Sequence, residues 1–328
     1  MTELPAPQNY NVKFTYSATL DSNEAAKTQT ENWIAQNYHA VIDMANLDRI
    51  GIADLCNKNS VYYVVASGVM TEVDWNVAKD YKYFLGQVGP NDDAEYNAGL
   101  AMGQYYKDTK NVKKVGIYGA FVPNPMHVNR LAGLITGLGG TYDGATGAAI
   151  AGKITQSVDS TKINIPGITV SYFDGFNPET TFGQFGAIAA SQPDAFLSVG
   201  MATTFFAGSL NDANIEYADI DSFTADNYGH MNDGKLGYLA GKYASSVGPV
   251  WALIQSAANG TPIRDNGKAV SVLQNFAVAK TAAECNAFTE AEGPVWNKTV
   301  LDQIISTNEK NVSLASFKTL VENDGKTA

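Results

Sequence analysis

Histidine, serine and cysteine side chains can act as metal ligands or nucleophiles, but here none stands in a spacing that supports such chemistry. The three histidines, His39, His127 and His230, have no second histidine four residues away, so a helix cannot present two of them to one metal ion. Ser67 lacks the flanking glycines of a nucleophile elbow. Cys56 lies on the apolar face of a predicted helix, where a thiol is more often an inert core residue. The sequence therefore indicates no catalytic site, no metal site and no cofactor.

The two cysteines, Cys56 and Cys285, are too far apart in sequence for a CxxC motif. Two cysteines also supply too few ligands for a structural zinc site. Whether they form a disulfide with each other is left open by the sequence.

Polar and aromatic residues follow many of the predicted strands. In an open α/β sheet, ligands bind at the carboxyl ends of the strands. A single residue of this kind is usually a turn or a helix cap, but a set drawn from two arrays of strands favours a ligand-binding cleft. The candidates from this pattern are Asn46, Ser67, Asn91, His127, Phe176, Thr203 and Asp226.

β-branched and aromatic runs alternate with helical stretches along the chain, which is typical of mainly parallel sheets. Strands are predicted at Val12–Ala18, His39–Ala45, Val61–Ser67, Tyr81–Gly89, Lys113–Phe121, Ile168–Phe173, Ala195–Gly200, Asp219–Ala225 and Ala269–Phe276. Helices are predicted at Leu20–Gln36, Ile50–Asn57, Asp92–Asp108, His127–Leu138, Thr180–Ser191, Thr203–Asp212 and in the second half of Lys235–Asn259. Gly99 and Gly103 lie on one face of their helix and predict its close packing on a sheet. The fold class is α/β, with two Rossmann-like lobes whose mainly parallel sheets are joined by crossover strands.

Length and composition agree with two folded domains. The chain has 328 residues, above the size at which a single core stops growing. Its 45% hydrophobic and 17% charged residues exclude a disordered chain. A net charge of -11 has the wrong sign for binding nucleic acid or an anionic membrane surface. There is no apolar run of about 18 residues, and the first ten residues lack the features of a secretory signal, which fits a cytoplasmic protein or a mature form.

Several segments, in their order along the chain, resemble one known family. They are ENWIAQNYHAVIDMAN, NDDAEYNAGLAMGQYY, KKVGIYGAF followed by HVNRLAGL, YFDGFNPETTFGQFGAIAASQPDAFLSVG, and NDGKLGYLAGKY followed by NGTPI. The chain resembles the type I periplasmic solute-binding proteins of ABC transporters, in particular the ribose-binding-like group and substrate-binding lipoproteins of Gram-positive bacteria. The resemblance extends from Tyr10 to Phe276, and its specificity lies in the order of loose motifs.

The resemblance implies two α/β lobes, three crossover strands and a ligand held between the lobes. It implies that Phe176 packs on the ligand and that Asp226 lies near an aspartate that accepts hydrogen bonds from ligand hydroxyls. Lys242 falls at a polar position facing the cleft, and Asn91 lies close to another. Arg130 matches a structural arginine of the family.

The resemblance also implies lobe boundaries. Lobe 1 comprises residues 1–91 and 242–268, lobe 2 comprises 92–241 and 269–276, and residues 277–328 form a tail that packs on the lobes. Asn11–Phe14 aligns with the second strand of the family, so we expect the chain to begin after the first strand and helix, which span about 25–40 residues by usual element lengths.

These features predict a binding protein and no enzyme. We expect it to capture a sugar or sugar-like molecule between hinged lobes as a monomer and to deliver it to an ABC transporter permease. Its location would be extracytoplasmic, either periplasmic or membrane-anchored as a lipoprotein. One alternative is a nucleoside-binding lipoprotein of the basic-membrane-protein type, and another is the effector domain of a transcriptional regulator. An α/β hydrolase or dehydrogenase is disfavoured by the missing motifs.

Overall fold

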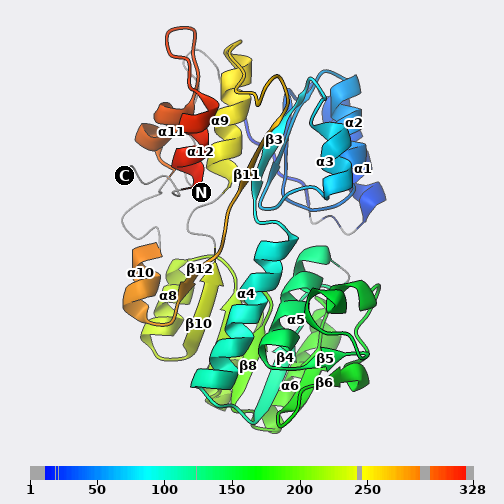
Figure 1. Ribbon diagram of the computed structural model, residues 1–328, viewed down its shortest axis with the longest axis vertical. Coiled ribbons are helices and arrows are strands. Elements are labelled where there is room, and N and C mark those ends of the chain that lie inside the picture. Colours follow the sequence, from blue (N-terminus) through cyan, green and yellow to red (C-terminus); the bar gives the residue numbers. More distant parts are fainter. Residues whose placement is uncertain are drawn as a thin grey trace. The chain divides into compact units, whose positions relative to one another are not determined.

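The computed structural model describes residues 12–18, 20, 22–122, 124–241, 246–288 and 296–322. The chain divides into two compact units, which are described separately (Figure 1). Unit 1 consists of Met1–Asn91, Ala244–Gln274 and Gly293–Ala328, and unit 2 of Asp92–Tyr243 and Asn275–Glu292. The chain passes from one unit to the other four times, once more than the three crossovers that the resemblance implies.

Unit 1 contains a four-stranded parallel sheet with the order β1-β2-β3-β11. Its strands are β1 (Ala40–Asp43), β2 (Tyr62–Ala66), β3 (Phe84–Gly89) and β11 (Val270–Leu273). Its helices are α1 (Asn23–Ala35), α2 (Arg49–Lys58), α3 (Glu72–Ala78), α9 (Val247–Ala258), α11 (Lys298–Ile304) and α12 (Leu314–Glu322). Strands β1, β2 and β3 follow one another in the same order in the sequence and in the sheet. Because the crossovers between parallel strands are right-handed, α2 and α3 lie on the same face of the sheet. Helix α9 covers the opposite face (Figure 1).

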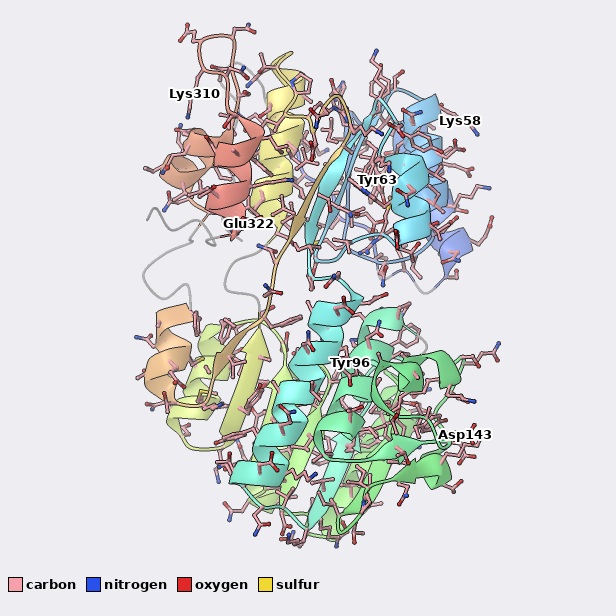
Figure 2. All side chains as sticks on the ribbon, in the orientation of Figure 1. Lys58, Tyr63, Tyr96, Asp143, Lys310 and Glu322 are labelled. Carbon is pink, nitrogen blue, oxygen red and sulfur yellow. The ribbon has the colours of Figure 1, made fainter. Side chains whose placement is uncertain are left out.

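Aromatic and β-branched side chains fill the core of unit 1. Tyr63, labelled in Figure 2, is fully buried and packs on Phe84 of the neighbouring strand with ring centroids 5.6 Å apart. Helix α9 is buried on nearly all sides, since it lies between the sheet and α11. At Gly248 a Cβ would meet the Cβ of Trp296 at 2.6 Å, so only glycine permits this close approach.

The predicted strand Val12–Ala18 is wrong, because these residues have no strand structure. Phe14 packs instead on Trp251 of α9, with ring centroids 5.2 Å apart. Thr15 accepts a hydrogen bond from the hydroxyl of Tyr38 at 2.7 Å. Side-chain contacts therefore hold this segment, and β1 forms one edge of the unit 1 sheet.

Unit 2 contains a six-stranded sheet with the order β12-β10-β9-β8-β4-β7, in which β12 alone is antiparallel to its neighbour. Its strands are β4 (Lys114–Tyr118), β7 (Thr169–Phe173), β8 (Ala195–Ser198), β9 (Tyr217–Ile220), β10 (Leu236–Gly241) and β12 (Ala277–Ala279). Its α-helices are α4 (Asp92–Gln104), α5 (Pro125–Gly137), α6 (Pro178–Ala190), α7 (Ala202–Ala213), α8 (Ala225–Asn232) and α10 (Ala282–Phe288). A π-helix, Tyr105–Thr109, continues α4, and the short strands β5 (Thr141–Tyr142) and β6 (Ile163–Asn164) form a separate hairpin-like pair.

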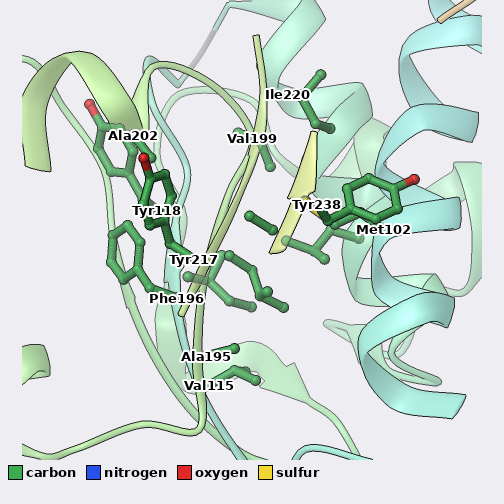
Figure 3. Close-up of a cluster of buried hydrophobic side chains, with 14 of the residues drawn as sticks. Met102, Val115, Tyr118, Ala195, Phe196, Val199, Ala202, Tyr217, Ile220 and Tyr238 are labelled. Carbon is green, nitrogen blue, oxygen red and sulfur yellow. The ribbon is translucent and has the colours of Figure 1, made fainter. Parts of the chain in front are cut away.

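The direction of the crossovers explains the layers of unit 2. The connection from β4 to β7 runs opposite to the connections from β7 through β8 and β9 to β10, so α5 lies on one face and α6, α7 and α8 lie on the other. Figure 1 shows α4 beside α5, and Figure 3 shows buried side chains of the sheet core, including Tyr118, Phe196 and Tyr238.

Glycines allow α4 and α5 to pack with their backbones nearly in contact. A Cβ on Gly99 would lie 1.9 Å from the carbonyl oxygen of Arg130, and a Cβ on Gly133 would lie 1.9 Å from that of Tyr96. The close packing predicted from Gly99 and Gly103 therefore exists, but against a helix and not against the sheet.

Two boundaries differ from the sequence expectations. Strand β11 pairs in parallel with β3, so residues 269–274 belong to unit 1 and not to the second lobe. The segment predicted as a strand at Asp219–Ala225 ends as a strand at Ile220, because Thr224 caps α8 by accepting a hydrogen bond from the backbone N–H of Asn227. The segment after Phe276 is divided between the units, with β12 and α10 in unit 2 and α11 and α12 in unit 1.

Candidate ligand-binding site

Three phenylalanine side chains gather at the carboxyl ends of the unit 2 strands. Phe121 follows β4 and Phe176 follows β7, and their rings stack with centroids 5.6 Å apart and planes at 18°. Phe205 of α7 contacts Phe176 at 5.6 Å. Phe121 is 36% exposed and Phe176 is 38% exposed, so the pair can receive the apolar face of a ligand. The sequence identifies Phe176 but not Phe121, although Phe121 ends a predicted strand.

His127, in the first turn of α5, lies beside this aromatic pair. Its ring is nearly perpendicular to the Phe176 ring, with centroids 6.4 Å apart and planes at 78°. Nδ1 lies 3.1 Å from the backbone nitrogen and 3.0 Å from the carbonyl oxygen of Phe121. Burial and the positive charge of Arg130 lower the pKa of His127 to about 3, so the imidazole is neutral at physiological pH. Nε2 has no hydrogen-bond partner in the described ranges and faces Gly200, which leaves it available to a ligand hydroxyl.

Arg130 is buried one turn further along α5, and its hydrogen bonds hold unit 2 together. Nε lies 2.5 Å from Oε2 of Glu95 in α4, and Nη1 donates to the carbonyl oxygens of Val199 and Ile220, at the ends of β8 and β9. The guanidinium also lies over the ring of Phe276 at 5.3 Å. These contacts agree with the structural role that the sequence resemblance implies for Arg130.

Thr203, a predicted ligand contact, lies in the first turn of α7 and bonds within unit 2. Its hydroxyl is 3.0 Å from the hydroxyl of Tyr217, and its backbone N–H donates to Asp219 Oδ2 at 3.2 Å. Met201, the N-cap residue of α7, makes no side-chain cap hydrogen bond. The carboxylate of Asp219 in β9 caps the helix instead. Burial raises the pKa of the Asp219 carboxyl to about 7, and the charge of Asp221 adds to the rise. The sequence pattern does not reveal this role of Asp219, because an aspartate inside a strand gives no local signal for a helix cap.

Asp226 does not lie at the end of a strand. It is exposed in the first turn of α8, where an acidic side chain interacts favourably with the helix dipole. The acid that directly follows β9 is Asp221, whose Oδ1 accepts a hydrogen bond from the backbone N–H of Ser222. Asp226 as a ligand contact therefore remains a proposal, and Asp221 joins it as a candidate.

Three predicted ligand residues lie at the carboxyl ends of the unit 1 strands, along one edge of the sheet. Asn46, Ser67 and Asn91 follow β1, β2 and β3, which are neighbours in the sheet. Ser67 has a positive φ of 63°, and its backbone N–H donates to the hydroxyl of Ser246. Asn46 also has a positive φ, of 56°. These turns place polar groups at the edge where α/β sheets bind ligands.

A buried polar group lies beneath this edge. The Tyr63 hydroxyl donates to Asp43 Oδ2 at 2.6 Å, and Asp43 Oδ1 accepts from the backbone N–H of Ala45.

Burial, with a smaller contribution from Asp43, raises the pKa of the Cys56 thiol to about 12. Cys56 therefore stays protonated, in agreement with an inert core residue. Both Cys56 and Cys285 are free.

Lys242, a ligand residue predicted from the sequence, lies outside the described residues. Within the described ranges, no three His, Cys, Asp or Glu side chains cluster in a way that could hold a metal ion. The helices described in the structure are also too short or too polar to cross a membrane.

Comparison with known proteins identifies the fold. No protein-family model and no curated protein sequence matches the chain. Solved structures do match, and they define the fold as that of the type I periplasmic binding proteins, with two α/β lobes and mainly parallel sheets.

Three of these structures are similar over most of their length. The periplasmic binding protein of the arabinose ABC transporter from Shewanella sp. ANA-3, bound to L-arabinofuranose, is 14% identical, with a TM-score of 0.54 over 81% of this chain and 80% of that one. A galactofuranose-binding protein is 10% identical, with a TM-score of 0.57 over 83% and 85%. A protein from Mycobacterium smegmatis in complex with β-D-fucofuranose is 13% identical, with a TM-score of 0.56 over 87% and 84%.

Proposed function

We propose that this protein is the extracytoplasmic solute-binding component of an ABC transporter and that it captures a sugar or sugar-like molecule. The observation that carries this proposal is the grouping of Phe121, Phe176 and His127 at the strand ends of unit 2. The fold supports it, because the similar structures bind arabinofuranose, galactofuranose or fucofuranose.

The chemistry of this group suits a polyhydroxylated ring. The C–H face of a sugar is apolar and packs on the exposed faces of Phe121 and Phe176. Hydroxyl groups both donate and accept hydrogen bonds, so they satisfy Nε2 of His127 in either tautomer of the neutral ring. A hydroxyl left without its partner in a closed site would cost roughly 1–3 kcal/mol, which gives the site selectivity.

Transport follows from binding without a chemical step. Similar structures are binding proteins rather than enzymes, and we infer that this protein releases its ligand unchanged. In a protein with an open and a closed state, a ligand stabilises the closed state by its differential affinity for that state. A permease would recognise the closed, loaded form of a monomer. Anchoring as a lipoprotein is part of the same proposal.

Thermal unfolding with a ligand panel tests this function. The panel contains L-arabinose, D-galactose, D-fucose, D-allose, polyols and nucleosides, and a ligand at 100 times its Kd raises the stability by about 2.7 kcal/mol. We expect a sugar to raise Tm. A rise with nucleosides alone would favour the nucleoside-binding alternative, and no rise with any compound would contradict sugar capture.

A further inference from the structure

Arg49, the first residue of α2, is buried at the carboxyl end of the unit 1 sheet. It is 7% exposed, and Nη1 donates to the carbonyl oxygen of Val69 at 2.9 Å. Its two Nη atoms lie against Gly68, where a Cβ would be 3.0 Å and 3.1 Å from them. The guanidinium therefore lies directly against the segment that leaves β2. In the sequence, Arg49 lies between the predicted ligand residues Asn46 and Ser67.

Among the residues that the structure describes, no acid neutralises this buried charge. Across the described part of the chain, no carboxylate oxygen lies within 4.0 Å of an Arg49 nitrogen. Nε has no hydrogen-bond partner there. Asp43, which is buried at the end of the neighbouring strand β1, bonds instead to Tyr63 and to the backbone of Ala45. A buried charge without a partner is costly, so an unpaired arginine at a ligand-binding edge indicates a missing partner.

The other two arginines of the chain have their partners inside the protein. Arg130 pairs with Glu95 and two carbonyl groups. Arg264, also in unit 1, donates through both Nη atoms to the carbonyl oxygens of Phe84 and Lys82, near the amino end of β3. Among the described residues, Arg49 has one such hydrogen bond, through Nη1, and its buried Nε has no partner.

We propose that Arg49 binds the transported solute directly by donating hydrogen bonds to its oxygen atoms. This inference rests on the proposed function and assigns the contact that unit 1 makes. A guanidinium only donates, so the group it binds is an acceptor, and its planar donors suit two oxygen atoms held side by side. Adjacent oxygens of a neutral sugar and the carboxylate of a sugar acid share this chemistry.

Isothermal titration calorimetry on the full chain tests the contact. The probes are L-arabinose, D-galactose, D-fucose, D-allose and D-galacturonate. For any probe that the wild type binds, we expect Arg49→Met to raise Kd about 10- to 100-fold, the loss typical of hydrogen bonds to a charged group. Arg49→Lys should recover part of the affinity, because it keeps the charge but not the fork. Tighter binding of D-galacturonate than of D-galactose would identify the carboxylate as the acceptor.

Arg264→Met is the matched control, since it removes an arginine from the same unit at the amino end of a strand. We expect it to leave Kd within twofold of the wild type and to lower the ligand-free Tm. Arg49→Met should leave the ligand-free Tm unchanged or raise it by a few degrees, because removing an unpaired buried charge offsets the lost bond to Val69.

Two results would overturn the assignment of Arg49. One is wild-type affinity in Arg49→Met, and the other is a ligand-free Tm that falls as far as in Arg264→Met, which would make Arg49 a structural residue. If the wild type binds none of the five probes, the proposed function loses its support, and the ligand-free Tm values still decide between a structural and a binding Arg49.

Discussion

Unit 1 and unit 2 each bury an arginine near the carboxyl ends of their strands, but they treat its charge differently. In unit 2, Glu95 and two carbonyl groups surround Arg130. In unit 1, Arg49 has one carbonyl partner and no acid among the described residues. A fully paired buried arginine holds helices and strands in place, whereas an unpaired one has donors left for a ligand. Burial alone therefore does not separate a structural charge from a binding charge.

The largest effect is expected from breaking the pair in unit 2. Glu95→Ala leaves Arg130 buried without its carboxylate, which should lower the free energy of unfolding by about 3–5 kcal/mol. Urea unfolding followed by circular dichroism measures this loss. The double variant Glu95→Leu with Arg130→Met is the control, since replacing both partners with apolar groups should recover most of the stability. A loss below about 1 kcal/mol in Glu95→Ala would remove the distinction between the two arginines.

Asp219 extends the comparison to a buried negative charge. Its compensation comes from a hydrogen bond with the Ser198 side chain and from backbone N–H groups of α7, yet burial raises its pKa to about 7, above the ordinary value of 3.8. Between these two pH values the folded state holds a proton that the unfolded state has lost, so stability falls as pH rises.

Asp219→Asn cannot ionise and should lack this decline. Relative to the wild type, the variant should gain on the order of 3 kcal/mol between pH 4.5 and pH 7.5. Urea unfolding at both pH values measures the difference. Equal pH dependence in the two proteins would mean that Asp219 stays ionised in the fold and that α7 compensates its charge fully.

The aromatic pair of unit 2 should affect binding more than folding. Phe176→Ala removes the exposed ring that stacks on Phe121, and we expect Kd for the best-bound sugar to rise about tenfold, as for the loss of an aromatic contact. Calorimetry measures the change. Phe182→Ala is a suitable control, because Phe182 is 46% exposed on α6 and contacts Phe206 rather than the pair. Equal effects of the two substitutions would exclude the pair from the site.

Most of the fold could be predicted because its signals are local. Alternating strand and helix patterns indicated two α/β units, and Ser22, a typical cap residue, caps α1 by accepting a hydrogen bond from the backbone N–H of Ala25. The failures lie where tertiary contacts decide. Val12–Ala18 has strand composition but packs through Phe14 and Thr15. Strand β11 belongs to unit 1 because it pairs with β3, about 180 residues earlier in the chain.

The site was less predictable than the fold, for a physical reason. Phe176 and His127 follow recognisable strands, and the structure brings them together. Arg49 looks like an ordinary charged residue at a helix start, because its burial depends on Gly68 and Val69, about 20 residues away. Asp219 likewise caps a helix that begins 17 residues before it. Sequence patterns show which residues end an element but not which charges find a partner.

The smallest effects should come from the two acids that follow β9. Asp226 is exposed in the first turn of α8, so Asp226→Asn should cost at most about 0.5 kcal/mol of stability through the helix dipole. Asp221 directly follows the strand, at the edge where α/β sheets bind ligands, and there Asp221→Asn should raise Kd for a sugar by a few fold, the effect of one weakened hydrogen bond. Calorimetry and urea unfolding on both variants separate the two roles. A larger rise in Kd for Asp226→Asn would return the ligand contact to α8, and the unit 2 part of the site would then extend from the strand ends to an exposed helix start.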